Sequence, residues 1–346
     1  MVSWLERVKD SKYVWYGLST AMIFVLIYFA DYQKFIDAVR SVKPVSMAIA
    51  FIFGISVFLV FGYIWHSFFR NLEISSGLYK SYKMFMGGHF MNSITPLGQL
   101  GGEPFMAYVV SKNTDSSYEK SLSAVVSSDI VIAIPVMTYT TAGVIYLLMF
   151  NNFSSFTQQV FYLMLTGLAV LGLLVYLLWF DRNKLVGAIF GLFDVVQTKF
   201  GLSQDFFGSL RDRIRSIKSA LDEVGRDPLH LAKVSIISHL YLVAQFFCLY
   251  FILKGLGVQP SILRIYFTVI LAGLAIFSPT PGGSGTFEAA FTGLLMFFYP
   301  EMALNTAVAA AVLFRLTTYW PGIVIGYFCL LKLRKTREAK EKARRD

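Results

Sequence analysis

Two segments of the sequence carry the same residue types at the same spacing. In each, a Ser-x-Thr-Pro-x-Gly run is followed five residues later by Glu, once from Ser93 to Glu103 and once from Ser278 to Glu288. Proline and glycine break a helix, and the free N–H groups of a helix that starts after glycines can bind an anion. The matched pattern indicates a paired site for a charged ligand, whereas single glycines would need no explanation beyond tight helix packing.

Four charged residues lie inside apolar stretches: Glu103, Asp129, Glu288 and Arg315. An ionisable side chain within a bilayer costs at least about 2.5–3.5 kcal/mol, so each needs a partner, a cavity or a role. One hypothesis is that Arg315 binds a phosphate while Glu288 or Glu103 couples binding to protons. The alternative is that Arg315 pairs permanently with Glu288 and only holds the fold together.

The candidate substrate-binding residues lie at the two breaks or on the apolar stretches that follow them. They are Asn92, Thr95, Pro96, Gly98, Gly101, Gly102, Glu103, Asp129, Thr280, Pro281, Gly282, Gly283, Gly285, Glu288 and Arg315. We assign no catalytic residue, metal ligand or cofactor. The four histidines are scattered without ligand spacing, and the glycine run from Gly282 lacks the Gly-Lys-Ser/Thr ending of a phosphate-binding P-loop.

The composition places these residues in a membrane. Charged residues make up 15% of the 346 positions and hydrophobic residues 56%, against roughly 25% charged in soluble domains. We therefore predict an all-α polytopic membrane protein with six full transmembrane helices, each long enough for a bilayer of about 30 Å. These are Val14 to Ala30, Pro44 to Phe69, Leu122 to Phe150, Gln159 to Phe180, Leu229 to Leu253 and Met302 to Leu331.

Two further apolar regions, Lys80 to Ser111 and Ile262 to Tyr299, contain the Pro-Gly motifs and cannot be single straight helices. Each is predicted to be a broken, re-entrant hairpin whose tip lies in a cavity, because irregular backbone at membrane depth needs one. Residues 14–150 and 159–331 then form two repeats. Because each contains three full crossings, the second is inverted relative to the first.

The whole chain, residues 1–346, is expected to be one integral membrane domain. Residues 181–228 are a cytoplasmic insertion between the repeats, with an amphipathic helix over Asp205 to Val224, and residues 332–346 are a basic cytoplasmic tail. The net charge of +10 gathers in segments predicted to be cytoplasmic, which indicates a cell-membrane protein with both termini inside and argues against nucleic acid as the partner.

Two motifs carry a family resemblance: Asn-x-x-x-Pro from Asn92 followed by Gly-Gly-Glu-Pro from Gly101, and Pro-x-Pro-Gly-Gly-x-Gly-x-x-Glu from Pro279, with Arg315 further on. With these, the chain resembles the lysylphosphatidylglycerol synthetase transmembrane, or flippase-like, family, which includes the membrane part of multiple-peptide-resistance factors. Many members have an arginine near the first-half acid. This chain has serines before Asp129, so Arg315 is the single deep arginine.

The resemblance implies a lipid translocase that moves a phospholipid or polyprenyl-phosphate-linked lipid by alternating access. The expected partners are anionic membrane lipids and a separate lipid synthase or glycosyltransferase. Resistance factors continue into a soluble aminoacyl-transfer domain, whereas only a short tail follows Leu333 in this sequence. We therefore expect no lipid aminoacylation by this chain. A membrane enzyme with Glu103 or Glu288 as general base, or an accessory protein in lipid-linked glycan or aminoacyl-lipid metabolism, stays an alternative.

Overall fold

The computed structural model describes residues 32–94, 102–150, 155–179, 187, 227–273 and 281–343. Every regular element within these ranges is a helix, which confirms the all-α prediction for the described part of the chain. Some of the predictions lie outside the described residues: the span Val14 to Ala30, nearly all of the insertion 181–228, and the site residues Thr95, Pro96, Gly98, Gly101 and Thr280.

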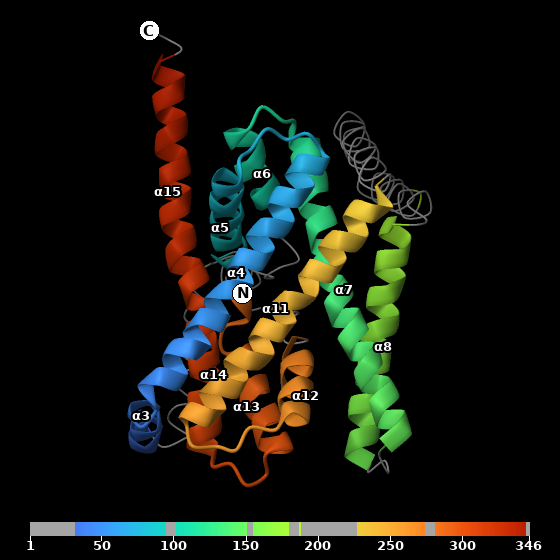
Figure 1. The fold of residues 1–346 in the computed structure, drawn as a ribbon, viewed down its shortest axis with the longest axis vertical. Coiled ribbons are helices and arrows are strands. Elements are labelled where there is room, and N and C mark those ends of the chain that lie inside the picture. Colours follow the sequence, from blue (N-terminus) through green and yellow to red (C-terminus); the bar gives the residue numbers. More distant parts are fainter. Residues whose placement is uncertain are drawn as a thin grey trace, which may run out of the picture. The chain divides into compact units, whose positions relative to one another are not determined.

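The helices are numbered as in Figure 1. In chain order they are α3 (Tyr32–Arg40), α4 (Pro44–Asn71), α5 (Leu78–Ile94), α6 (Glu103–Asn113), α7 (Tyr118–Phe150), α8 (Ser155–Trp179), α11 (Pro228–Gly255), α12 (Ile262–Ala272), α13 (Thr286–Phe298), α14 (Leu304–Thr318) and α15 (Trp320–Ala343), with a 3₁₀ turn, η3, at Pro281–Gly283. The last helix, α15, continues through most of the predicted basic tail, as its length in Figure 1 shows.

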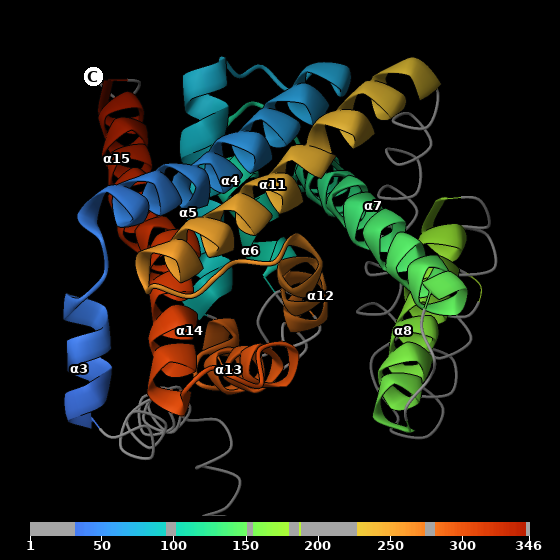
Figure 2. The same cartoon turned by 60° about the horizontal axis from the view of Figure 1, so that its bottom comes forward.

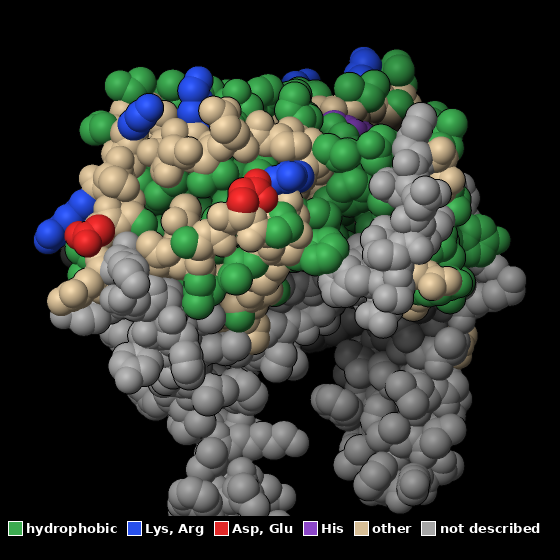
Figure 3. All heavy atoms as spheres, turned by 90° about the horizontal axis from the view of Figure 1, so that it is seen from below, with side chains coloured by type: hydrophobic (Ala, Val, Ile, Leu, Met, Phe, Trp, Pro, Cys, Tyr) green, Lys and Arg blue, Asp and Glu red, His purple; other side chains and the backbone are tan. Residues whose placement is uncertain are grey.

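Four helical segments in the described residues are long and apolar enough to cross a membrane, and they coincide with four of the six predicted spans. They are Pro44–Asn71, Tyr118–Met149, Pro228–Gly255 and Leu304–Thr336. Helix α8 forms over the range predicted for another span. Many large apolar side chains on these helices are exposed, and hydrophobic side chains outnumber charged ones among the described residues on the face in Figure 3. The arrangement of six full spans plus two re-entrant hairpins stays a prediction.

The last predicted span forms but is interrupted at Tyr319, where α14 ends and α15 begins. Pro321 has no N–H to continue the helical ladder, so the helix breaks just before it, and proline is well tolerated at the start of the next helix. The N–H of Tyr319 still donates to the Arg315 carbonyl at 2.9 Å. Tyr319, the residue at this break, therefore still lies one helical turn after Arg315.

Both predicted broken regions consist of two helices each in the described residues. The first contains α5 and α6, which approach closely where Gly88 meets Met106. The second contains α12 and α13, with η3 immediately before α13. Helix α13 packs against both α12 and α14, as the two views in Figure 1 and Figure 2 show.

The chain divides into two compact units. One contains Met1–Tyr63, Tyr82–Val109 and Leu240–Asp346, and therefore most of α5 and all of α12 to α15; the other contains Ile64–Ser81 and Val110–His239, where α7 packs against α8. Glycines allow close helix contact in the first unit. A Cβ on Gly54 would lie 2.5 Å from the Thr317 carbonyl oxygen, and one on Gly322 would lie 2.6 Å from the ring of Phe58.

Candidate functional site

The centre of the candidate site is Arg315, on α14. Among the described residues, Arg315 and Glu288 are the two charged residues that are buried, at 6% and 3% exposed. Four alanines, Ala307 and Ala309 to Ala311, are fully buried in the turns before Arg315, so small side chains let α14 sit deep in its unit. The arginine is thereby held away from water, and a charge buried in this way needs hydrogen-bonded partners in the protein.

Glu288, in the first turn of α13, is the acidic partner of Arg315. The Arg315 Nε donates to Glu288 Oε1 at 3.1 Å, and the Gly285 backbone N–H donates to Glu288 Oε2 at 2.7 Å. A carboxylate in the first turn also faces the positive end of the helix dipole. Both oxygens of Glu288 therefore accept hydrogen bonds, and the carboxylate occupies the place where a helix start would otherwise bind an anion.

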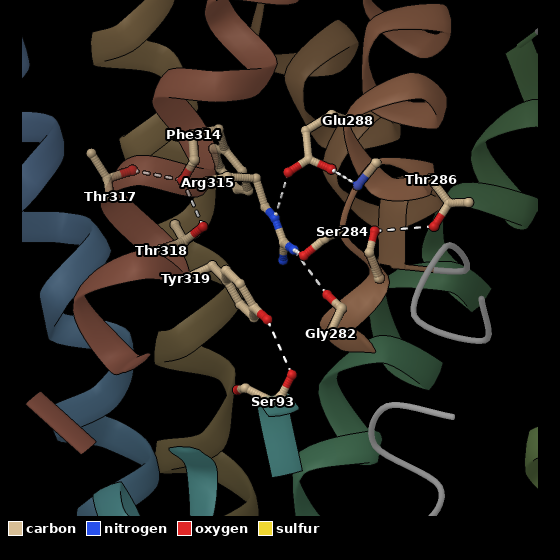
Figure 4. Close-up of polar contacts among 12 residues, drawn as sticks. Ser93, Gly282, Ser284, Thr286, Glu288, Phe314, Arg315, Thr317, Thr318 and Tyr319 are labelled. Carbon is tan, nitrogen blue, oxygen red and sulfur yellow. Dashed lines mark hydrogen bonds and ion pairs between the residues drawn. The ribbon is translucent and has the colours of Figure 1, made fainter. Parts of the chain in front are cut away.

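The glycine turn before α13 supplies the next contact. The Arg315 Nη2 donates to the Gly282 carbonyl at 2.8 Å, with a longer contact of 3.4 Å to Ser284 Oγ. Gly282, Gly283 and Gly285 have φ values of 58°, 69° and 83°, which L-residues with a side chain rarely adopt. The successive glycines turn the Gly282 carbonyl toward the guanidinium, as Figure 4 shows.

Aromatic rings cover the faces of the guanidinium. The Arg315 Cζ lies 3.6 Å from the centroid of the Tyr319 ring and 5.0 Å from that of Phe287. Such cation–π contacts are worth about 2 kcal/mol when desolvated. The third guanidinium nitrogen, Nη1, has no hydrogen-bond partner among the described residues. Described residues thus engage two of the three guanidinium nitrogens.

Tyr319 also connects this site to the end of α5. Its hydroxyl donates to the Ser93 carbonyl at 3.4 Å, and Ser93 Oγ donates to the His89 carbonyl at 2.8 Å (Figure 4 shows the first of these). His89 packs against the rings of Phe58 and Phe85, and its buried Nε2 has no partner within the described part of the chain. The end of α5, just before the first break, therefore contacts the arginine site through the backbone carbonyl of Ser93.

The structure brings five of the predicted site residues together: Gly282, Gly283, Gly285, Glu288 and Arg315. They adjoin Pro281, which opens the 3₁₀ turn. In the first broken region, Gly102 lies directly on the Asn92 side chain, so closely that any Cβ would overlap it. Glu103 is the first residue of α6 and is not fully buried. Asp129 lies on α7 in the other compact unit.

Three residues of the site were missed from the sequence: Ser284, Phe287 and Tyr319. A signal for Tyr319 was present, because residues four apart share a helix face and Tyr319 follows Arg315 by that distance. Phe287 and Ser284 flank predicted residues in the same loop and helix start. No sequence pattern favours the Ser284 hydroxyl or the Phe287 ring over the many similar groups in an apolar chain.

A second arginine–glutamate pair involves Arg264, in the first turn of α12, and provides a contrast. Arg264 Nη1 donates to Glu301 Oε1, and these side chains are 40% and 64% exposed. The backbone N–H of Glu301 and then the Arg264 guanidinium hold the pKa of the Glu301 carboxyl below its ordinary value. Solvent screens this pair, so it contributes little to stability.

The other three histidines have structural partners. His66 Nδ1 lies 3.1 Å from Ser81 Oγ, and His230 Nε2 lies 2.8 Å from Ser67 Oγ. His239 Nδ1 lies 2.7 Å from a carbonyl oxygen one turn earlier on its own helix. No group of three His, Cys, Asp or Glu residues among those described is arranged to hold a metal ion.

Residues 14–326 match the protein family described as "Lysylphosphatidylglycerol synthase TM region". The chain belongs to this family. The matched range contains both broken regions, Glu288 and Arg315, so the site lies within the part of the chain that defines membership. The family assignment confirms the resemblance carried by the two glycine-rich motifs and supports a membrane protein with a lipid-related role.

Archaeal proteins called UPF0104 membrane protein are similar along most of their length. The one from Pyrococcus horikoshii is 24% identical over 342 residues, covering 94% of this chain and 98% of the relative. Those from Methanothermobacter thermautotrophicus and Methanocaldococcus jannaschii are 25% and 22% identical, covering 82% and 94% of this chain and 84% and 95% of the relatives. The similarity therefore extends over the whole membrane region, not over one motif.

Proposed function

We propose that this protein translocates a phospholipid or a polyprenyl-phosphate-linked lipid across the membrane, with the lipid phosphate bound at Arg315. The single observation that carries the proposal is a buried arginine whose faces are covered by rings, whose Nε and Nη2 are held by Glu288 and Gly282, and whose Nη1 has no partner in the described residues. An arginine held rigidly in this way is suited to a phosphate, because the guanidinium matches phosphate oxygens geometrically.

The surroundings of Glu288 support an anionic ligand. Its carboxylate sits at the start of α13, bonded to the Gly285 N–H, where helix N-termini bind phosphate in other proteins. A lipid phosphate that bound Arg315 would lie beside this helix start, while its hydrocarbon tail stayed in the bilayer. The family supports the same class of ligand, because it is named for a synthase of lysylphosphatidylglycerol, a phospholipid.

Movement between the two leaflets is proposed to use the two predicted repeats. Inverted repeats meeting around a midplane site give two states of similar energy, one open to each side, which is the basis of alternating access. The pairs α5–α6 and α12–α13 would be the elements that open and close the site. The family and the long apolar helices are consistent with this proposal.

We also propose a cell-membrane location with both termini in the cytoplasm. Basic residues gather at Arg70, Lys80, Lys83, Lys112 and Lys120, around the ends of α4 to α7, and positive residues favour the cytoplasmic side. The test is labelling of single cysteines introduced at Lys80 or Lys120 in a variant that has Cys248 and Cys329 replaced by serine. Labelling from outside intact cells would reverse the proposed orientation.

The translocase is tested in proteoliposomes that contain fluorescent phosphatidylglycerol or a fluorescent polyprenyl monophosphate. We expect movement between leaflets above the rate of protein-free vesicles, and a fall of roughly 10- to 100-fold for Arg315→Ala, because charged hydrogen bonds to the phosphate are lost. Arg264→Ala removes a matched but exposed arginine and should behave like the wild type. Equal rates with and without protein for both lipids would overturn the proposal, and a new lipid species in the vesicles would support the enzyme alternative.

A further inference from the structure

The charge of the site is balanced without a ligand. Among the buried described residues, the positive charge of Arg315 is matched by the negative charge of Glu288, and both are less than one-tenth exposed. A lipid phosphate that joined this pair would leave one uncompensated negative charge in an apolar interior, which is strongly unfavourable. Binding of the anion therefore requires a compensating positive charge.

We propose that Glu288 takes up one proton when a lipid phosphate binds to Arg315, so that the lipid and the proton cross the membrane together. This inference rests on the proposed lipid translocase and names its second substrate. The proton comes from water on the side to which the site is open and bonds to Glu288 Oε1. Arg315 keeps its own proton and charge, because a guanidinium is effectively always protonated.

The contacts of Glu288 suit this exchange. Oε1 accepts from Arg315 Nε, so a phosphate that bound Nε as well as Nη1 would compete with the carboxylate for that donor. Oε2 accepts from the Gly285 N–H, and a protonated carboxyl keeps that acceptor. The new hydroxyl on Oε1 can then donate to a phosphate oxygen. The start of α13 does not have to unfold or rearrange when the ligand replaces the carboxylate on the guanidinium.

The neighbouring ionisable groups leave Glu288 as the proton carrier. The groups around it are Arg315 on α14, the Tyr319 phenol at the break before α15, and His89 on α5, which interacts electrostatically with Arg315. On α12, Arg264 is engaged with Glu301 at the opposite end of the helix. Phe314 on α14 stacks on Phe287 and Phe291 of α13 and adds no charge. Glu288 alone in this set contacts the guanidinium with an acidic oxygen.

The exchange predicts how charge moves in one transport cycle. The loaded site holds one guanidinium, one neutral carboxyl and one phosphate monoanion, and the empty site holds the ion pair seen in Figure 4, so both forms are neutral. Wild-type transport should follow a pH gradient and ignore the membrane potential. In Glu288→Gln the empty site keeps a net positive charge, so transport should follow the potential and ignore the pH gradient.

The experiment uses vesicles of phosphatidylcholine containing fluorescent phosphatidylglycerol, a monoanion, and measures its distribution between leaflets at steady state. With one unit of pH difference, wild type should enrich the lipid about tenfold in the leaflet facing the higher pH. Glu288→Gln should show no such enrichment but respond to a 100 mV potential by roughly 50-fold. His89→Gln should keep the wild-type behaviour.

The outcomes separate the two proposals. Wild type that moves the lipid but follows the potential instead of the pH gradient overturns proton coupling and leaves the translocase standing. Coupling lost in His89→Gln but kept in Glu288→Gln overturns the role of Glu288. No movement of this lipid or of polyprenyl monophosphate by wild type overturns the translocase itself. Because the wild-type result decides the first question, a misfolded Glu288→Gln protein would not prevent the test.

Discussion

The two broken regions of this chain have similar sequences but differ in the structure. In the second, Glu288 lies in the first turn of α13, accepts from the Gly285 N–H and pairs with Arg315. In the first, Glu103 is itself the first residue of α6. The position that corresponds to Arg315 in the first half is Asp129, which cannot pair with a glutamate. One break has thus become the charged site, and the other contributes backbone to it.

The helices that follow the breaks differ as well. Each contains a proline six residues beyond its charged residue. Helix α7 continues through Pro135, whereas the second-half segment is interrupted at Tyr319, just before Pro321. Tyr319, at that interruption, lies against the guanidinium. The two halves thus accommodate the matched proline differently, and in the second half the residue at the break is an aromatic one that covers the arginine.

The largest effect is expected from removing Arg315, because its absence leaves Glu288 buried without a charged partner. Arg315→Ala should lower the free energy of unfolding by about 3–5 kcal/mol, the usual result of breaking a buried pair on one side. Arg264→Ala breaks an exposed pair and should cost no more than about 1 kcal/mol. Thermal unfolding in detergent measures both. A similar loss in the two variants would show that burial does not distinguish the pairs.

Replacing a glycine by alanine should lower the stability of the protein at both breaks, but for different reasons. Gly282→Ala forces a left-handed φ on an alanine and should cost about 1–3 kcal/mol. Gly102→Ala should cost a similar amount because its methyl would overlap Asn92. Gly273→Ala is the control, since the space around Gly273 is open and its φ is −57°.

Double variants sharpen this comparison of the glycines. Asn92→Ala should rescue Gly102→Ala in part, because it removes the Oδ1 and Cγ atoms that the new methyl meets but keeps Cβ, 2.7 Å from that methyl. Tyr319→Phe removes the hydroxyl beside Gly282 but not the backbone strain, so it should rescue Gly282→Ala only in part. Thermal stability of the single and double variants gives the coupling. Complete rescue at Gly282 would mean that crowding, not the left-handed turn, is what requires glycine.

Much of this site could be predicted from the sequence, because burying a charged side chain in a bilayer costs free energy and few residues of this chain do so. That argument found Glu288 and Arg315, and the glycines around them were identified by their regular spacing. It also grouped Asp129 with them, although spacing along the chain cannot say which unit a helix joins. The pairing with the turn carbonyl of Gly282 depends on three left-handed glycines acting together, which no periodic pattern reveals.

The two glutamates should differ more than their shared motif suggests. Glu288→Gln leaves the charge of Arg315 buried without an acidic partner, although the amide oxygen can still accept from Nε, and should cost about 3 kcal/mol. Glu103→Gln removes a charge that the dipole of α6 favours and partial burial disfavours, so stability should change by less than about 1 kcal/mol. Thermal unfolding of the two variants, measured side by side, checks the ranking. Equal losses would mean that Glu103 has a charged partner of comparable strength.

The smallest effect is expected at the contact that joins the two broken regions. Tyr319→Phe keeps the ring over Arg315 and loses only a hydrogen bond of 3.4 Å to the Ser93 carbonyl, so stability should change by about 0.5 kcal/mol or less. Tyr319→Ala also removes the ring and should cost about 2 kcal/mol more. If the phenylalanine variant instead lost as much stability as the alanine variant, the hydroxyl contact between the regions, rather than the aromatic cover of the guanidinium, would be what Tyr319 provides.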